Sequence, residues 1–452
     1  MKNHYDVVIV GGGIGGLGVL HYLKKKNLKV TLLEKSEKCG GLVQSAVDGN
    51  HLLEVGPNAF LKSYKNTYDF ICEVGLADQI IGNQPEAYHR YIYRNGKIHS
   101  LPEDPISFFR SNLLSLAAKL RLFLEPFVLR GAQEESIKDF GNRRFGKEVT
   151  EVILDAMVKG ICTGDISKLD INSMFPKLKD IEKKYRSLLL FLLFFKKRNV
   201  QKTNNGKKTL FLSLKNGMGD IANHVSSKYI ADIQTGCFVT KILKEDLLYK
   251  VFTEKGILYA NEVVLATKAM EAASIIKNIY PDYANILCQI PYANVATVTL
   301  SWKKEAVLHP LDGFGFLSSS KENLNILGAL FSSSLFPNRT PEDEKMIKVY
   351  LGGPQKNDIL KLLDQEIIEL VLKDIKPILQ VRDKYQYVKL KRIENAIPLF
   401  NMGHKKIKEE LKNLSVKHQG LYLVGNYLDG ISVDATLKVA HSVSEQINNL
   451  SS

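Results

Sequence analysis

The sequence contains no long apolar run, few cysteines and a single tryptophan. Its apolar block 188–195 has eight residues, and no run reaches the ~18 residues that a membrane-spanning helix needs. A strand is expected from Tyr5 onwards, which leaves no room for the charged and apolar regions of a secretory leader. We therefore expect a cytosolic chain that does not span a membrane.

The cysteines and histidines form no pattern that is typical of a metal site or a nucleophilic enzyme. Five cysteines are spread along the chain without a Cys-x-x-Cys pair, which argues against a disulfide framework and against a zinc site: Cys39, Cys72, Cys162, Cys237 and Cys288. The ten histidines are scattered, without a convincing His–Asp, Ser–His or Cys–His arrangement. We expect buried free thiols and no metal.

Acidic residues are too few to balance the basic ones, so the net charge is +14. A basic balance favours an anionic partner such as nucleic acid, an acidic lipid surface or a carboxylate-bearing substrate. Residues 177–208 hold eleven basic and two acidic residues. Because no nucleic-acid-binding module is recognisable, we do not expect a nucleic-acid partner.

A glycine-rich loop near the N-terminus predicts a phosphate site. Residues 7–10 are all apolar and predict a buried parallel strand, and a helical pattern follows the loop. Gly11, Gly13 and Gly16 match G-x-G-x-x-G, in which the glycines allow a tight turn, a nearby pyrophosphate and close helix–strand packing. A second strand over 29–33 ends at Glu34, where a ribose-binding acid is expected. The loop alone leaves NAD and FAD open.

Two further segments favour FAD. Residues 34–45, EKSEKCGGLVQS, resemble the segment after the ribose acid in flavin enzymes of the amine-oxidase type, with Gly40 and Gly41 passing close under the cofactor. Residues 420–447 read as a strand, a glycine turn and a helix, which can return to the first domain, present Gly425 to the pyrophosphate and bring residues 432–435 near the flavin. A domain that binds only NAD does not need such a distant segment.

Longer segments resemble protoporphyrinogen oxidases, the flavin enzymes of late haem synthesis, over nearly the whole chain. The spacing of GDISKL (164–169) and RSLLL (186–190) is not generic to flavin proteins. Leu399 and Phe400 stand where the family often has Gln and Tyr, and Ile166 where it often has Pro. These departures leave the preferred porphyrinogen open. The matching segments are 54–60, 89–102, 135–178, 181–190, 214–225, 313–322, 327–343, 396–404 and 425–433.

The resemblance implies an oxygen-dependent enzyme that removes six electrons from protoporphyrinogen IX and releases protoporphyrin IX and hydrogen peroxide. Each step would pass a hydride to N5 of a non-covalently bound FAD, which carries the difficult chemistry. No dedicated base is needed, because protons can leave from pyrrole nitrogens. Three alternatives stay open: coproporphyrinogen III as substrate, an amine-oxidase-like or desaturase-like flavoenzyme, and a non-catalytic docking subunit.

The resemblance also assigns site residues. Arg90 would bind a substrate propionate, because a guanidinium pairs with both carboxylate oxygens; from the residues alone it is a surface arginine on an edge strand. Asn58 would lie near the flavin, although a Pro-Asn turn explains it equally. Gly160 and Gly164 would let backbone approach the macrocycle, and Leu317, Phe331 and Phe336 would line an apolar slot, with helix-stop and core roles as the respective alternatives. The cofactor set is Gly11, Gly13, Gly16, Glu34, Gly40, Gly41, Gly56, Val239, Gly425, Ser432 and Val433.

The predicted fold is α/β, with a Rossmann-like FAD-binding domain of the amine-oxidase type (1–60, 205–270 and 410–452) and a mixed-sheet substrate domain (61–104 and 271–409). A helical insert (105–204) contains the apolar segments 106–130 and 186–199, whose basic flanks suit an anionic leaflet. A buried helix with a solvated basic loop is the alternative. We expect attachment to the cytoplasmic face of the membrane, a disordered loop over 199–208, and ferrochelatase or a second copy as partners.

Overall fold

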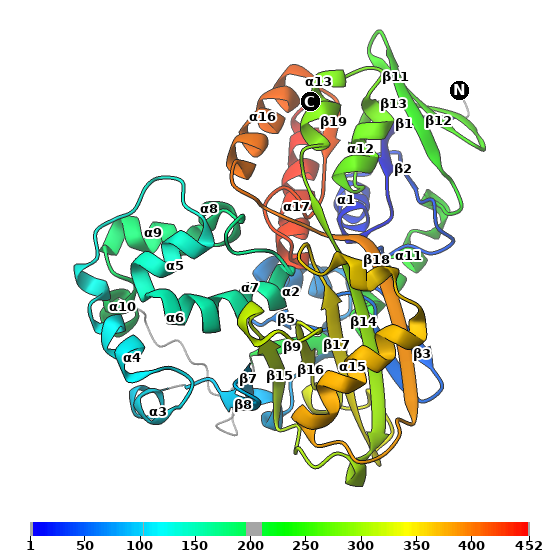
Figure 1. The fold of residues 1–452 in the computed structure, drawn as a ribbon. Helices are drawn as coiled ribbons and strands as arrows, with labels where there is room; N and C mark the ends of the chain where they lie inside the picture. Colours follow the sequence, from blue (N-terminus) through cyan, green and yellow to red (C-terminus); the bar gives the residue numbers. More distant parts are fainter. Residues whose placement is uncertain (1–2, 103, 196–209, 451–452) are drawn as a thin grey trace.

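The computed structural model describes residues 3–102, 104–195 and 210–450. Figure 1 shows an α/β part around β1, a second part built on a broad sheet with α15, and a helical projection that extends from their junction. The predicted disordered loop at 199–208 lies outside the described residues.

The first sheet has β1 (His4–Val10) at its centre. β1 pairs in parallel with β2 (Val30–Leu33) on one side and with β13 (Gly256–Leu265) on the other. The long β13 pairs through its first half with antiparallel β12 (Leu248–Thr253) and through its second half with parallel β19 (Leu421–Leu423). The edge strands are β10 (Ile233–Gln234), beside β2, and β11 (Val239–Glu245), beside β12.

Helices cover both faces of this sheet, as a parallel strand that is apolar throughout requires. Val7 and Ile9 share one buried core with α1 (Ile14–Lys24) and α17 (Val433–Leu450). Val8 and Val10 point to the opposite face, since successive residues of a strand alternate. That second core contains α12 (Ala269–Ile276), α13 (Pro281–Leu287) and one side of α16 (His404–Lys417). Residues 271–287, which the sequence pattern assigns to the substrate domain, therefore pack on the first sheet.

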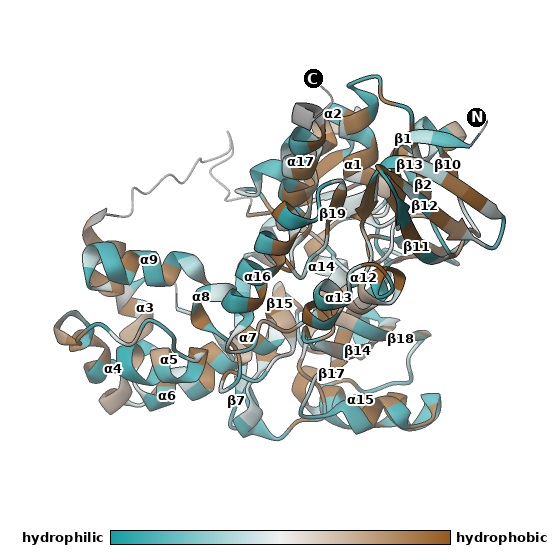
Figure 2. Ribbon diagram, turned by 90° about the horizontal axis from the view of Figure 1, so that it is seen from above, coloured by the Kyte–Doolittle hydropathy of each residue, from teal (hydrophilic) through white to brown (hydrophobic). Residues whose placement is uncertain are grey.

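The second sheet is mixed, in the order β18-β14-β17-β16-β15-β7-β8. β15 and β7 pair in parallel, and the other neighbours are antiparallel. One face buries a core against α15 (Asp364–Leu379), whose outer face is hydrophilic (Figure 2). The strands are β7 (His89–Arg94), β8 (Lys97–Ser100), β14 (Tyr292–Lys303), β15 (Gly313–Ser318), β16 (Gly328–Leu330), β17 (Glu344–Gly352) and β18 (Tyr387–Pro398).

Short elements connect the two sheets. The hairpin of β3 (Ser45–Asp48) and β4 (His51–Glu54) leads into the loop 55–59. Strand β9 (Phe211–Leu214) then pairs with β5 (Phe60–Leu61) and β6 (Ile80–Gly82). The connecting helices are α2 (Lys65–Val74), α11 (Asp220–Lys228) and α14 (Ser332–Leu335), with short turns η1 (Ala77–Gln79), η2 (Pro85–Tyr88), η6 (Ile230–Asp232), η7 (Lys304–Ala306), η8 (Ser320–Glu322) and η9 (Asn357–Lys361).

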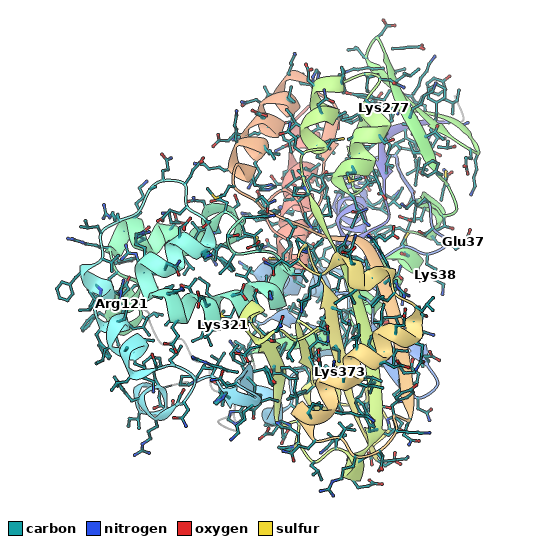
Figure 3. The ribbon with its side chains drawn as sticks, viewed as in Figure 1. Glu37, Lys38, Arg121, Lys277, Lys321 and Lys373 are labelled. Atoms are coloured by element: carbon teal, nitrogen blue, oxygen red, sulfur yellow. The ribbon has the colours of Figure 1, made fainter. Side chains whose placement is uncertain are left out.

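The helical projection joins the second sheet through α7 and η4. Lys321 lies at this junction (Figure 3), and its ammonium group is 3.0 Å from the Glu151 carboxylate. Within the described residues, no helix combines the length and the apolar composition needed to cross a bilayer. The elements are α3 (Pro105–Arg110), α4 (Leu116–Phe123), η3 (Glu125–Phe127), α5 (Ile137–Phe145), α6 (Lys147–Val149), η4 (Thr150–Leu154), α7 (Asp155–Cys162), α8 (Ile171–Met174), α9 (Pro176–Tyr185), α10 (Leu188–Leu190) and η5 (Phe191–Phe195).

A buried ionic network holds the projection together. Arg144 is fully buried and pairs with Glu125 at 3.0 Å and with Glu182 at 2.5 Å. Burial opposes ionisation of Glu182, but hydrogen bonds from Arg143, Arg144 and Lys179 outweigh it and lower the pKa of Glu182 to about 2. Because each buried charge faces an opposite one, removing a single partner would leave an uncompensated charge in the interior.

Glu262 on β13 makes folding stability depend on pH. Burial raises the pKa of its carboxyl group from 4.5 to about 7. The hydroxyl of Tyr422 donates to Oε1 at 3.4 Å, whereas Oε2 is buried without a hydrogen-bond partner among the described residues. Between these two pKa values the folded state keeps a proton that the unfolded state has released. Stability contributed by this group therefore falls as pH rises from about 4.5 to 7.

We expect Glu262→Gln to stabilise the protein more at pH 8 than at pH 5, because the amide cannot ionise. The stabilisation at pH 8 should exceed the stabilisation at pH 5 by about 1–3 kcal/mol, measured as the change in the free energy of unfolding in urea. Glu254→Gln, on the exposed turn before β13, is the matched control and should show no such difference. Equal effects of Glu262→Gln at both pH values would contradict the assignment.

Candidate functional site

Glycines at the end of β1 bring a helix N-terminus to the carboxyl edge of the first sheet. The backbone of Gly11 has a φ of +106°, and a Cβ atom there would lie 2.5 Å from the carbonyl oxygen of Ala266. A Cβ atom at Gly16 would lie 1.9 Å from the carbonyl oxygen of Gly11, so only glycine lets α1 pack this close. At Gly13, by contrast, a Cβ atom would meet nothing within 4 Å. Open space therefore faces the start of α1, where a phosphate binds well.

Glu34 follows β2 at the same edge. Its Oε2 accepts a hydrogen bond from the amide of Gly12 at 2.6 Å, and its Oε1 accepts from the amide of Ser36 at 2.8 Å. These contacts fix the carboxylate beside the glycine loop and leave lone pairs for further donors. A ribose offers hydroxyl donors, so the placement fits the predicted role.

The segment around Gly40 lies directly against the loop. The amide of Gly40 donates to the carbonyl of Gly12 at 2.7 Å, and a Cβ atom at Gly41 would be 3.3 Å from the Cα of Gly13. Both residues have positive φ angles, +118° and +58°, which favour glycine. A Cβ atom at Gly56 would lie 2.5 Å from the carbonyl oxygen of Leu42. The chain thus leads from the phosphate loop to the loop 54–58.

The C-terminal segment returns to this edge. The amide of Val424 donates to the carbonyl of Leu265 at 2.9 Å, so Gly425 follows a strand that is parallel to β1. Ser432 precedes α17, which begins at Val433, and its Oγ accepts from the amide of Ala435 at 3.1 Å. Since β1, β2 and β19 are parallel, the loops that follow them meet at one edge, the usual position of a dinucleotide in such sheets.

Val239 is placed by the strand edge beside Glu34. The amide of Cys237 donates to the carbonyl of Glu34 at 2.9 Å, and Val239 begins β11 two residues later. The Val239 side chain itself is buried in the core between β11 and α12. The predicted cofactor residues thus come from the loops and strand ends around one edge, from the first turns of α1 (Gly16) and α17 (Val433), or from the adjoining loop at Gly56. Open space at Gly13 and the fixed acceptor at Glu34 both fit FAD.

An aromatic wall leads from this edge to Arg90. Asn58 donates through Nδ2 to the hydroxyl of Tyr350 at 2.7 Å. Tyr350 packs in one apolar cluster with Phe211 and Phe314, whose ring centroids are 4.4 Å apart. The guanidinium carbon of Arg90 lies 5.7 Å from the centroid of the Phe211 ring. Arg90 is exposed, and no carboxylate of the described residues pairs with it.

The other predicted substrate residues lie elsewhere in the packing. A Cβ atom at Gly160 would be 2.4 Å from Cδ2 of Leu317, and one at Gly164 would be 2.5 Å from Cδ1 of Leu169. The space beside these two glycines is therefore occupied by protein side chains, those of Leu317 and Leu169. Phe331 differs most from its predicted place, because its ring is fully buried in the core beneath α15. Phe336 is also buried, but it lines a small cavity together with Asn58.

The structure adds residues that sequence reasoning missed. Phe211, Phe314 and Tyr350 build the wall, and Lys348 lies behind Asn58. The sequence held one signal for Lys348 and Tyr350. They lie two positions apart on β17, so their side chains point to the same face of the sheet. The loop that they contact is distant in the sequence, because Asn58 lies 290 positions before Lys348 and 292 positions before Tyr350. Among the described residues, no cluster of His, Cys, Asp or Glu is suited to a metal ion.

Gly13→Val tests the cofactor site. The substituted side chain would occupy the space in front of α1, so we expect loss of bound flavin, seen as loss of absorbance near ~450 nm, with an unchanged far-ultraviolet spectrum. Gly16→Val is the contrasting variant, because its side chain collides with the Gly11 carbonyl and should disrupt the fold itself. Full flavin content in Gly13→Val would contradict the placement.

Two curated relatives align with nearly the whole chain. The coproporphyrinogen III oxidase of Bacillus subtilis (strain 168) is 27% identical, over 96% of this chain and 95% of that protein. The mitochondrial protoporphyrinogen oxidase of Nicotiana tabacum is 28% identical, over 95% of this chain and 92% of that protein. These similarities cover both sheets and the helical projection.

The fold has solved counterparts. A crystal structure from Exiguobacterium sp. 255-15, described as a candidate protoporphyrinogen oxidase, superimposes with a TM-score of 0.85 at 22% identity, over 100% of this chain and 99% of the other. The family of flavin-containing amine oxidoreductases matches residues 14–448. The chain therefore belongs to this family and is an FAD-dependent oxidoreductase that resembles protoporphyrinogen and coproporphyrinogen oxidases.

Proposed function

We propose that this enzyme oxidises protoporphyrinogen IX to protoporphyrin IX, a six-electron reaction with oxygen as acceptor and hydrogen peroxide as by-product. The observation that carries the proposal is the alignment of more than nine-tenths of the chain with oxidases named for porphyrinogen substrates. Coproporphyrinogen III is the alternative substrate, because one of the two relatives is named for it.

The chain's own residues support a flat, apolar substrate that carries carboxylates. The rings of Phe211, Phe314 and Tyr350 offer an apolar surface, which binds a macrocycle and displaces water. Arg90 at the end of this surface has no carboxylate partner among the described residues and suits a propionate. Bound FAD, held without a covalent bond, supplies the acceptor for the electrons. The wall and the arginine supply binding and orientation.

The first experiment offers protoporphyrinogen IX and coproporphyrinogen III in air to the purified yellow protein, each with a control lacking enzyme. Porphyrin fluorescence should rise fastest with protoporphyrinogen IX. Faster oxidation of coproporphyrinogen III would make that compound the substrate. Rates equal to the controls with full flavin occupancy would refute porphyrinogen oxidation and favour the docking subunit, and hydrogen peroxide production from an amine instead would favour an amine oxidase.

Arg90→Ala should raise the KM for the porphyrinogen by about 10- to 100-fold with little change in kcat, because a charge-assisted pair with a propionate is lost. Arg90→Lys keeps the charge but not the planar fork, so an intermediate KM is expected. Arg130→Ala, an exposed arginine on the helical projection, is the matched control. An unchanged KM in Arg90→Ala would contradict the propionate role.

We also propose that the helical projection attaches the enzyme to an anionic membrane surface on its cytoplasmic side. Large apolar side chains on α3, α4, η3, η5 and the turns beside η3 are exposed: Ile106, Phe109, Leu116, Leu120, Phe123, Leu124, Phe127, Leu129, Leu192, Leu193 and Phe194. Exposed basic residues flank them, including Arg110, Lys183 and Lys184. Lys119, also within the projection, is by contrast buried and donates to the carbonyls of Phe109 and Ser111.

Exposed apolar side chains with basic flanks are typical of an interfacial membrane segment. From the resemblance to protoporphyrinogen oxidases, we also propose ferrochelatase and a second copy of this chain as partners. Both compounds of the proposed reaction are poorly soluble, so a surface that keeps the enzyme at the lipid is consistent with it. Light scattering of the detergent-solubilised enzyme, alone and with added ferrochelatase, tests these two partners.

Changing Leu192, Leu193 and Phe194 together to Ser should lower cosedimentation with vesicles rich in anionic lipid at least about tenfold, because three exposed apolar side chains are removed. The control changes Ile230, Leu247 and Val416 to Ser, which are also exposed but lie on the first-sheet part, in η6, the turn after β11 and α16. Equal binding of both variants and the parent would contradict the proposed surface.

A further inference from the structure

Lys348 is a buried lysine whose ammonium group faces a single loop. It is 3% exposed on β17, between apolar neighbours. Its Nζ lies 2.7 Å from the carbonyl oxygen of Glu54, 3.4 Å from that of Gly56 and 3.5 Å from Oδ1 of Asn58. An ammonium group has three donors, and the loop 54–58 offers three acceptors. Lys348 thus ties the second sheet to the loop that adjoins the predicted flavin site.

Several charged groups surround this ammonium. Burial lowers the pKa of Lys348 to about 8; the Glu54 carboxylate on β4 opposes that effect and Lys391 on β18 adds to it. The Glu54 carboxylate is also close to Arg339, and burial raises the pKa of the Glu54 carboxyl group. Its oxygens accept from Oγ of Ser45 at 2.6 Å and from the amide of Met218 at 2.9 Å. Tyr350, two residues along β17, is the remaining titratable neighbour, and burial raises its pKa.

The charge on Lys348 and the carbonyl of Gly56 both favour one orientation of the Asn58 amide. A protonated lysine can only donate, so the atom of Asn58 that faces it must be the oxygen. The Nδ2 group then donates to the hydroxyl oxygen of Tyr350 at 2.7 Å and to the carbonyl of Gly56 at 3.4 Å. Because the Tyr350 oxygen accepts this bond, the Tyr350 hydroxyl hydrogen is directed away from Asn58. It is left as a donor on the aromatic wall.

We propose that Lys348 is a positioning residue, which fixes the orientation of the Asn58 amide and thereby keeps the Tyr350 hydroxyl as a hydrogen-bond donor toward the substrate. A neutral amine can accept as well as donate, so deprotonation would leave only the Gly56 carbonyl, 3.4 Å from Nδ2, to orient the amide. Asn58 could then turn over, and Tyr350 would donate to it instead of to the substrate. The part of this inference that concerns turnover rests on the proposed function.

The kinetic test is a double-mutant cycle in the flavin-loaded enzyme. Lys348→Met and Tyr350→Phe should each lower kcat/KM about tenfold, since each removes the same donor. The double variant should be no slower than Tyr350→Phe alone. A further tenfold loss in the double variant would overturn the proposal, because Lys348 would then act independently of Tyr350. Should Lys348→Met fail to fold, Glu54→Gln/Lys348→Met removes both buried charges and takes its place.

A pH profile separates positioning from a purely structural role. The parent should lose activity above about pH 8, the pKa of Lys348, whereas Lys348→Met should lack this decline and Lys348→Arg should move it to higher pH. Lys345→Met is the matched control: this lysine lies on β17, but it points to the other face and donates to the carbonyls of Val307 and His309. An identical decline in the parent and in Lys348→Met would overturn the inference.

A stability cycle tests the contact without any turnover. Lys348→Met and Asn58→Ala should be coupled, with their combined effect on the unfolding equilibrium constant at least about threefold smaller than the product of the single effects. Lys345→Met with Asn58→Ala should show no coupling. Absence of coupling for the first pair would overturn the orientation of Asn58. Coupling in a protein that oxidises neither porphyrinogen would support that orientation while refuting the proposed function.

Discussion

The contact between α1 and β1 is the constraint on which the cofactor site depends. With a Cβ position at Gly16 only 1.9 Å from the Gly11 carbonyl, any side chain would push the helix away from the sheet. The close packing aims the N-terminus of α1 along the edge of the sheet and leaves space at Gly13. The Glu34 carboxylate and the backbone of Gly40 and Gly41 then contact the same loop.

The loop 54–58 transmits this arrangement to the second sheet. Gly56 lies against Leu42 on the cofactor side, while Lys348 and Tyr350 bind the loop from β17. Burying an ammonium group is unfavourable unless it is paired, so Lys348 is stable in this position only while its three acceptors are in place. The two sheets are therefore not merely adjacent. A charged contact links β17 to this loop, with Nζ of Lys348 2.7 Å from the carbonyl oxygen of Glu54.

The phosphate loop and its ribose acid could be predicted from the sequence because their logic is local. The glycines, the strand before them and Glu34 lie within one stretch of 34 residues, and each has a steric or chemical reason of its own. The aromatic wall could not be predicted in this way. Tyr350 contacts Asn58, which lies 292 positions away in the sequence. Phe211 lies on β9 and Arg90 on β7, and since these strands belong to different sheets, the contact depends on how the sheets pack together. Phe331 shows the converse error, since an aromatic residue in an expected slot segment is buried in the core beneath α15.

The helical projection poses a different problem, because both its interior and part of its outer surface are apolar. Hydrophobic burial alone does not specify which side of such helices faces inward, since either arrangement removes apolar area from water. The ionic network resolves this ambiguity. Glu125 is 1% exposed, accepts from the amides of Leu188 at 3.1 Å and Leu189 at 3.2 Å, and pairs with buried Arg144. Such a network adds little stability over apolar packing, but each of its buried charges must face an opposite one, which favours this arrangement. It therefore fixes η3 beside the start of α10 and leaves Phe127, Leu192, Leu193 and Phe194 exposed.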